Sequence, residues 1–257
     1  MGALENSRER PRPHQPPHYC SGGVSVALIE PAGPHTARMW EETTDIRARI
    51  DALPFLAELG AGTLDPEKFT FYIQQDAQYL VAYQKTMTAI ARQAPGADEL
   101  RFWAKSAVGA IAEEKAMQEE LFTNDILAAH RVEGLGMSLH TAAYSNFLLA
   151  SATYDTYAVA AAAVLPCYWI YAESGVAVLD ASKGALEGHP YGTWVEAYAD
   201  ETFTRISREA VQLVEEACDA AGEAERERAI EAFRQATRFE ELFWTQPMDE
   251  PEARILI

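Results

Sequence analysis

The segment LPCYWIYAESG, residues 165–175, contains the most reactive side chain type in this sequence, the thiol of Cys167. Pro166 precedes it inside an apolar, helix-forming stretch. Because proline lacks an N–H, the helix should bend there and free the carbonyl of Ala162. Cys167 and Tyr171 share a helical face, which pairs a nucleophile with a phenol that can stack and form hydrogen bonds. The alternative is inert packing, since free cysteine is among the most buried residue types.

A carboxylate lies among aromatic residues in a second segment, FTFYIQQDAQYLVAY, residues 69–83. Asp76, Tyr79 and Tyr83 follow one another at spacings of three and four residues, so they share a helical face. If that face is turned to the core, the carboxylate must be paired or hydrogen-bonded, and buried carboxylates tend to mark functional sites. Neighbouring glutamines make the opposite orientation, with Asp76 in solvent, equally compatible with the pattern.

The segment RFEELFW, residues 238–244, joins another carboxylate to an aromatic face. Glu240 precedes Phe243 and Trp244 by three and four residues, and Glu241 points elsewhere. The default for both glutamates is a solvated surface position. Further candidates for a ring-lined pocket are Tyr144 and Tyr198, although each taken singly is compatible with ordinary packing.

These side chains lie on different amphipathic helices and could converge inside a helical bundle, which is where bundles build their sites. A thiolate would act as nucleophile on a flat heteroaromatic ring, and a carboxyl group would protonate a ring nitrogen. Tyrosines would stack on the ring and orient it. The spacing permits covalent catalysis of this kind without proving it.

The elements that must position these residues are helices. From Ala37 onward apolar residues recur at three- and four-residue spacing, and no alternating run requires a strand. No linker divides this part, so one all-α domain is expected over 37–257. Helices are predicted over 37–53, 65–93, 97–124, 138–152, 156–181, 190–219 and 222–247.

Residues 1–36 differ in composition from the rest, with six of the thirteen prolines and three of the six histidines. They lack a sustained helical or strand period, so they are predicted to form a disordered tail. His14, His18 and Cys20 could be imagined as metal ligands. The segment offers neither further ligands nor a rigid frame, so no metal site is expected.

The overall composition restricts the function. A formal net charge of −18, from 21 basic and 39 acidic residues, argues against a protein that binds nucleic acid through phosphate contacts. No apolar run is long enough to suggest a membrane span. Three cysteines at unrelated spacings indicate a reducing cytoplasm without disulfides.

At these residues the chain resembles the TenA family, also called thiaminase II or aminopyrimidine aminohydrolase, within the haem-oxygenase-like all-α fold. The likeness runs from about Trp40 to Trp244 and includes GTLDPEKFTFYIQQDAQYL, AYSNFL, LPCYWIYAESG, HPYGTWVEAY and FEELFW. It implies that Cys167 is the nucleophile, Glu240 the acid/base, and Asp76 the carboxylate that binds the amino group and ring nitrogen of a pyrimidine. The pocket tyrosines of the family correspond to Tyr79, Tyr144, Tyr171 and Tyr198.

The resemblance implies a hydrolase of thiamine salvage. It would convert 4-amino-5-aminomethyl-2-methylpyrimidine, or thiamine, to the hydroxymethyl pyrimidine through a cysteine-linked adduct, without metal or cofactor. A homotetramer is also implied.

Two features depart from the family pattern: residues 1–36 lie outside the likeness, and Gln118 in MQEEL occupies a place where many relatives have histidine. We expect the second change to affect local packing or substrate preference.

Two other functions stay open. One is another activity of the same fold, such as pyrroloquinoline-quinone synthesis or haem oxygenation. A haem oxygenase needs a proximal histidine on its first helix, but residues 37–53 contain none and His35 falls in the predicted tail. The other is a regulatory or scaffold protein, against which the acidic charge and the lack of a DNA-reading motif both weigh.

Overall fold

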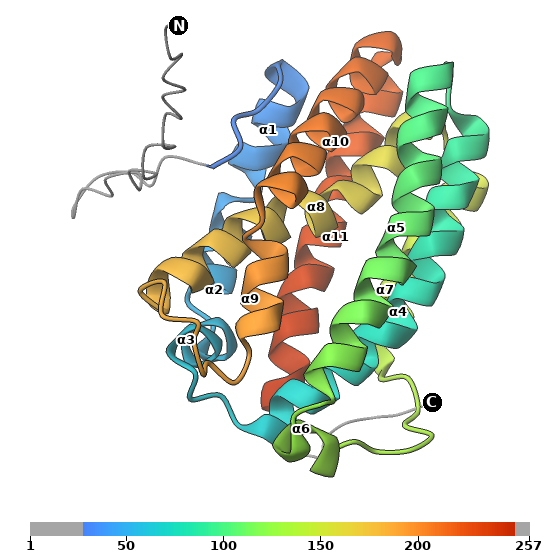
Figure 1. Cartoon of the computed structure of the whole chain (residues 1–257). Helices are drawn as coiled ribbons and strands as arrows, with labels where there is room; N and C mark the ends of the chain where they lie inside the picture. Colours follow the sequence, from blue (N-terminus) through green and yellow to red (C-terminus); the bar gives the residue numbers. More distant parts are fainter. Residues whose placement is uncertain (1–27, 250–257) are drawn as a thin grey trace, which may run out of the picture.

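The computed structural model describes residues 28–249, apart from the side chains of residues 110, 111, 113 and 114, and every regular element in that range is helical (Figure 1). The predicted all-α class is confirmed. The long helices are α4 (Pro66–Gln93), α5 (Ala97–Leu121), α7 (Leu139–Tyr154), α8 (Tyr157–Ala181), α10 (Glu201–Ala220) and α11 (Glu223–Thr245). The short ones are α1 (Pro34–Glu42), α2 (Thr44–Asp51), α3 (Pro54–Ala61), α6 (Asp125–Ala129), α9 (Gly192–Tyr198) and the 3₁₀ helix η1 (Gln246–Met248).

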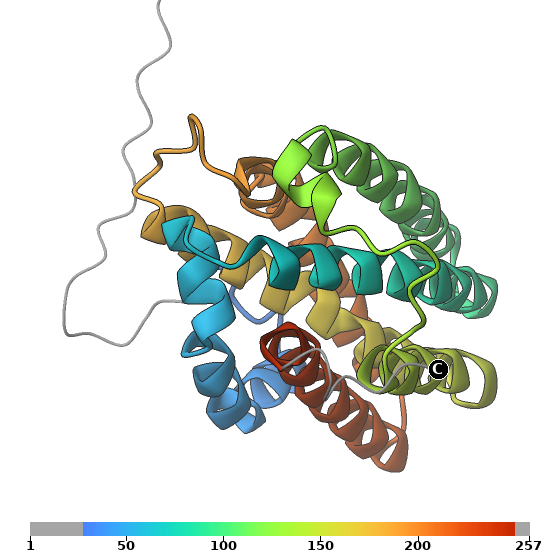
Figure 2. The same ribbon diagram turned by 90° about the horizontal axis from the view of Figure 1, so that it is seen from below.

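Helix α8 lies at the centre of the bundle, and its composition explains its place (Figure 2). Every residue from Ala158 to Pro166 is buried, because a helix that is apolar on all sides must be surrounded. Helices α7, α10 and α11 pack along it. Contrary to expectation, α8 is long and apolar enough to cross a membrane, but 72% of its most apolar window is buried inside the protein.

Five of the predicted helices agree with α4, α5, α7, α8 and α11 to within three residues at each end. Capping side chains explain this accuracy. Asp65 accepts a hydrogen bond from the Glu67 N–H at 2.9 Å at the start of α4, and Ser138 accepts one from the Thr141 N–H at 3.1 Å at the start of α7. Such caps satisfy N–H groups that have no partner within the helix.

The other two predicted helices are each divided. The predicted helix 37–53 consists of α1 and α2, separated at Thr43, and 190–219 consists of α9 and α10. Asp200 starts α10 by accepting a hydrogen bond from the Thr202 N–H at 2.7 Å. The short helices α3 and α6 were not predicted, since a few residues cannot display a helical period. Gly62 ends α3 with a positive φ of 69°, which favours glycine.

The first described residues are ordered against α8, which corrects the predicted disorder up to residue 36. The Glu173 carboxylate accepts hydrogen bonds from the backbone N–H groups of Leu28, at 3.0 Å, and Ile29, at 2.9 Å. Ile29 is fully buried. Residues 1–27, which include His14, His18 and Cys20, lie outside the described residues.

Another carboxylate, which is buried, fixes the start of α1. Glu215 of α10 accepts hydrogen bonds from the backbone N–H groups of His35, at 3.1 Å, and Thr36, at 2.7 Å, and from the Thr36 hydroxyl, at 2.7 Å. A helix N-terminus carries unpaired N–H donors and partial positive charge, so a carboxylate stabilises it. The boundary of the ordered part is set by partners about 140 to 180 residues away in sequence, which local composition does not reveal.

An aromatic stack joins α1 to α8 beside this segment. The rings of Trp40 and Trp169 lie 4.1 Å apart between centroids and are nearly parallel, at 11°. The Arg47 guanidinium lies 3.6 Å from the Trp40 ring centre on α1, a cation–π contact. The Trp169 indole N–H donates to the Ile29 carbonyl at 3.2 Å, so the stack and residues 28–29 pack as one unit.

Candidate active site

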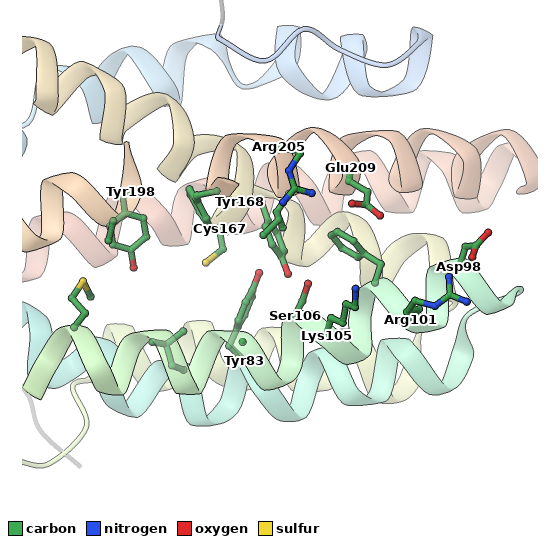
Figure 3. A pocket seen from close by; sticks show the side chains of 17 residues that line it. Tyr83, Asp98, Arg101, Lys105, Ser106, Cys167, Tyr168, Tyr198, Arg205 and Glu209 are labelled. Atoms are coloured by element: carbon green, nitrogen blue, oxygen red, sulfur yellow. Dashed lines mark hydrogen bonds and ion pairs between the residues drawn. The ribbon is translucent and has the colours of Figure 1, made fainter. Parts of the chain in front are cut away.

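Helix α8 continues through Pro166 and presents Cys167 to a cavity of about 630 Å³ (Figure 3). Helices α5 and α10 supply most of the walls. The volume lies within the range of about 300–1,000 Å³ typical of small-molecule sites. Cys167 therefore borders open space, whereas the bend at Pro166 and the free Ala162 carbonyl stay predictions.

Two tyrosines of α4 contact the thiol. The rings of Tyr79 and Tyr83 stack with centroids 5.4 Å apart. Burial raises the pKa of the Cys167 thiol well above its usual value, and the charges of Glu240 and Asp76 raise it further, whereas hydrogen bonding with Tyr79 and Tyr83 lowers it. Since burial dominates, Cys167 is a neutral thiol in the resting protein at neutral pH.

Glu240 of α11 is only 1% exposed and accepts a hydrogen bond from the Tyr144 hydroxyl at 2.6 Å. Burial raises the pKa of Glu240 to about 8, although the hydrogen bond from Tyr144 opposes the change. The side chain therefore carries a proton at neutral pH and can donate it. The default surface position is wrong for Glu240, whereas Glu241 does lie on the outside and pairs with Arg49 at 2.6 Å.

Asp76 and Tyr171 extend the same cluster. Asp76 is 3% exposed, so the core-facing alternative is the one realised. Its charge acts on both Cys167 and Tyr171. The Tyr171 ring packs against Trp244 with centroids 4.5 Å apart, and its hydroxyl lies 3.4 Å from that of Tyr72.

Tyr198 of α9 reaches the cavity because Gly175 of α8 lets the two helices approach closely. A Cβ atom added to Gly175 would lie only 2.4 Å from the Tyr198 carbonyl oxygen. The Tyr198 ring packs against Tyr171 with centroids 5.1 Å apart. The last residue of the LPCYWIYAESG segment thus positions a predicted pocket tyrosine.

The structure brings all the predicted site residues into one region, in two layers. Cys167 and Tyr198 line the cavity. The other residues form a buried inner layer that is connected to Cys167 by side-chain contacts. Tyr79 interacts with both the thiol and Tyr144, and Tyr144 donates a hydrogen bond to Glu240. The inner layer contains Asp76, Tyr79, Tyr144, Tyr171 and Glu240.

Several residues near the thiol were not assigned a role from sequence. Tyr83 shares the face of Asp76 and Tyr79, and that spacing was the available signal. Tyr168 interacts with the hydroxyls of Tyr83 and Ser106. No local pattern could identify the Tyr168–Ser106 contact, since it joins α8 to α5.

Gln118, the residue that departs from the family pattern, approaches the Ile73 carbonyl at 3.5 Å and does not line the cavity.

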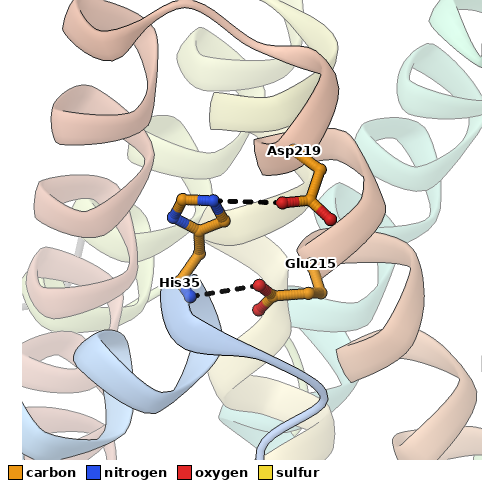
Figure 4. Close-up of side chains that lie close together, drawn as sticks. All are labelled: His35, Glu215 and Asp219. Carbon is orange, nitrogen blue, oxygen red and sulfur yellow. Dashed lines mark hydrogen bonds and ion pairs between the residues drawn. The ribbon is translucent and has the colours of Figure 1, made fainter.

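One group of described residues offers ligand atoms within 4.8 Å of one another, namely His35, Glu215 and Asp219 (Figure 4). His35 lies 3.3 Å from Asp219 through its Nε2 atom. Both Glu215 oxygens already accept hydrogen bonds from the start of α1, so this cluster acts as a helix cap. His35 belongs to the first helix rather than to a tail, but it does not line the cavity.

Comparison with known proteins identifies the family. The model of the TENA/THI-4/PQQC family matches residues 41–250. The chain belongs to this family. Among relatives within it, the thiamine biosynthesis multifunctional protein ThiED of Corynebacterium glutamicum is 36% identical over 85% of this chain. The chain spans only 27% of that relative's length, and 29% of its counterpart from Corynebacterium efficiens.

Single-unit members of the TENA/THI-4/PQQC family match along most of their length. The aminopyrimidine aminohydrolase of Halalkalibacterium halodurans is 26% identical over 77% of this chain and 88% of its own. A TenA homologue from Pyrococcus horikoshii superposes with a TM-score of 0.70 at 24% identity, covering 83% of this chain and 97% of the homologue. The fold is therefore the helical haem-oxygenase-like fold, as predicted.

Proposed function

We propose that the protein hydrolyses 4-amino-5-aminomethyl-2-methylpyrimidine to the hydroxymethyl pyrimidine and ammonia, with thiamine as a further substrate. The observation that carries the proposal is a thiol that lines a cavity, with the buried carboxyl group of Glu240 close enough to act on it electrostatically. Relatives named aminopyrimidine aminohydrolase support it. We expect a homotetramer in the cytoplasm that needs no metal or cofactor.

The reaction begins with addition of the Cys167 sulfur to an electron-poor ring carbon. Glu240 donates its proton to a ring nitrogen, which holds the charge that develops on the ring. The thiol proton moves through the Tyr79 and Tyr144 hydroxyls to Glu240, following the contacts that join these residues. A neutral thiol and a neutral carboxyl group thus reach the adduct without an external base.

Ammonia then departs from the exocyclic methylene with a proton taken from Glu240, and water adds to the exposed carbon and gives a proton back to Glu240. Expulsion of the thiolate restores the ring, and the protons return to sulfur and carboxyl, so that amine and water become alcohol and ammonia. Asp76 binds the amino group and a ring nitrogen of the pyrimidine by charge-assisted hydrogen bonds. Tyr171 and Tyr198 stack on the ring from the side of α8 and α9.

Replacement of the thiol tests the proposal. We expect Cys167→Ser to abolish turnover of the aminomethyl pyrimidine, because a hydroxyl lacks the nucleophilicity of a thiolate at neutral pH. Cys218→Ser is the matched control, since Cys218 is buried in α10 and does not line the cavity. Product formation and circular dichroism are measured together, and a folded, fully active Cys167→Ser protein would exclude the covalent route.

A regulatory function is the competing proposal, and the same assay distinguishes it. A regulator would bind the pyrimidine without releasing ammonia at any concentration of protein. Haem oxygenation is less compatible with the site, because the only first-helix histidine among the described residues, His35, faces Asp219 and not the cavity.

A further inference from the structure

The cavity has two chemically different ends. The thiol end contains Cys167 and Tyr198. The charged end is lined by Asp98, Arg101, Lys105, Arg205 and Glu209. Figure 3 shows Lys105 and Arg205 entering from opposite walls, one from α5 and the other from α10. The proposed reaction assigns no role to this charged end.

Among the described lining residues, the balance of charge at the charged end is positive. Asp98 and Arg101 form an ion pair at 2.5 Å and largely neutralise each other. Of the described charged residues there, Lys105, Arg205 and Glu209 remain, which leaves one positive charge in excess. Among the described residues neither of these two cations lies within ion-pair distance of a carboxylate. In a chain with a net charge of −18, this opening is a locally favourable place for an anion.

Two hydroxyl groups line the same cavity as the two cations. Ser106 follows Lys105 on α5, and its hydroxyl interacts with that of Tyr168 on α8. Both residues line the cavity. A guanidinium, an ammonium and neighbouring hydroxyls are the donors that proteins use for phosphate oxygens.

The cavity is also larger than the proposed substrate requires. A volume of about 630 Å³ corresponds to about twenty water molecules at about 30 Å³ each. The aminomethyl pyrimidine has about ten non-hydrogen atoms and would fill roughly half of that space. With the pyrimidine at the thiol end, a substrate longer than the aminomethyl pyrimidine can extend its leaving group along the cavity toward the charged end.

We propose that the charged end binds a phosphate group on the leaving-group side of the substrate, so that the protein accepts phosphate esters of thiamine. This inference rests on the proposed function. The local positive charge opposes the thiazolium cation of thiamine itself, and a phosphate ester removes that penalty. Hydrolysis would consume water and release the hydroxymethyl pyrimidine, the thiazole phosphate and a proton.

Kinetics with two substrates test the proposal. We expect wild-type kcat/KM to be higher for thiamine monophosphate than for thiamine. Lys105→Ala and Arg205→Ala should each lower the ratio of these two values by about tenfold, mainly through KM, since each variant loses one charge-assisted contact to the phosphate. The ratio is used because it cancels any general effect of a substitution on the fold.

Matched controls come from the same helices. Lys115→Ala on α5 and Arg208→Ala on α10 remove the same charges from exposed positions that do not line the cavity, so the ratio should stay at the wild-type value. A wild-type protein that prefers thiamine, or equal losses in all four variants, would overturn the phosphate subsite.

A binding measurement separates this inference from the proposed function. Calorimetry on the Cys167→Ser protein compares thiamine monophosphate with thiamine at low and high salt. Tighter binding of the phosphate ester that weakens with salt supports the subsite even if no hydrolysis is ever detected. Equal affinities refute the subsite even if the aminomethyl pyrimidine is turned over.

Discussion

Glu240 and Glu241 are adjacent in sequence, yet burial gives them different chemistry. Glu240 is enclosed and hydrogen-bonded to Tyr144, whereas Glu241 pairs with Arg49 at the surface. We expect Glu240→Gln to lower kcat by about 10²- to 10⁴-fold with a small change in KM, since a general acid acts on the developing charge. Glu241→Gln should cost at most about 1 kcal/mol of stability. Steady-state kinetics of both variants decide between the two glutamates.

The protonation state of Glu240 also predicts a pH profile. Because its pKa is raised to about 8, the acid form is present below that pH and disappears above it. We expect kcat/KM for the aminomethyl pyrimidine to fall as the pH rises through about 8, and we expect the part of this fall that belongs to Glu240 to be absent from the residual activity of Glu240→Gln. An activity that increases through the same range would show that Glu240 acts as a base.

At this scale the sequence identified the residue types and their faces but not their burial. The helical pattern was equally compatible with an Asp76 side chain in the core and one in solvent. The structure places it in the core. Helices α5, α7 and α8 pack against α4, and the spacing of residues within α4 does not show which of its faces these helices cover. The catalytic and binding roles carried over from the family resemblance remain predictions.

Close contact between two elements, α8 and α9, depends on Gly175. Alanine normally favours a helix by about 1 kcal/mol over glycine. Here its Cβ would lie 2.4 Å from the Tyr198 carbonyl oxygen, so α9 must move. We expect Gly175→Ala to lower the thermal midpoint and to raise KM, because Tyr198 shifts with its helix. Gly222→Ala, with nothing within 4 Å of the added atom, is the control for an added methyl group without a steric clash; Gly222 is the N-cap of α11, so a small loss of helix stability is expected there.

The N-terminal element gives a second prediction. Deleting residues 1–27 leaves the contacts of Glu173 and Glu215 in place, so we expect the thermal midpoint to stay near that of the full chain. Deleting residues 1–36 leaves the partly buried Glu173 and the buried Glu215 without these N–H donors, at a cost of about 1–3 kcal/mol for Glu215 and less for Glu173. Differential scanning calorimetry of the two truncations measures the difference, and equal midpoints would contradict it.

Helix positions were predictable wherever a long apolar period ended in a capping residue, as at Asp65 and Ser138. They were not predictable where a helix had fewer than two turns, as in α6, or where order came from distant residues, as in residues 28–36. A proline-rich composition indicates disorder only if the rest of the molecule offers no partner. Here α8 and α10 each supply a carboxylate.

For the whole molecule, a buried proton on Glu240 makes stability depend on pH. The folded state keeps this proton up to about pH 8, whereas an unfolded glutamate releases it near 4.3. Between these values the folded state binds more protons, so this residue's contribution to the free energy of unfolding falls as pH rises. We expect Glu240→Gln to gain stability relative to wild type between pH 5 and pH 8, as measured by urea unfolding. A constant difference across that range would refute the buried proton.

The parallel Trp40–Trp169 pair has an optical consequence. Two indoles stacked at 4.1 Å should couple their electronic transitions, and a coupled pair in a fixed chiral arrangement gives a strong signal in near-ultraviolet circular dichroism. Since the Trp169 N–H is bonded to the Ile29 carbonyl, detachment of the N-terminal segment should change that signal before the helices melt. The protein thus contains an intrinsic spectroscopic reporter, independent of catalysis, for the docking of its first ordered residues.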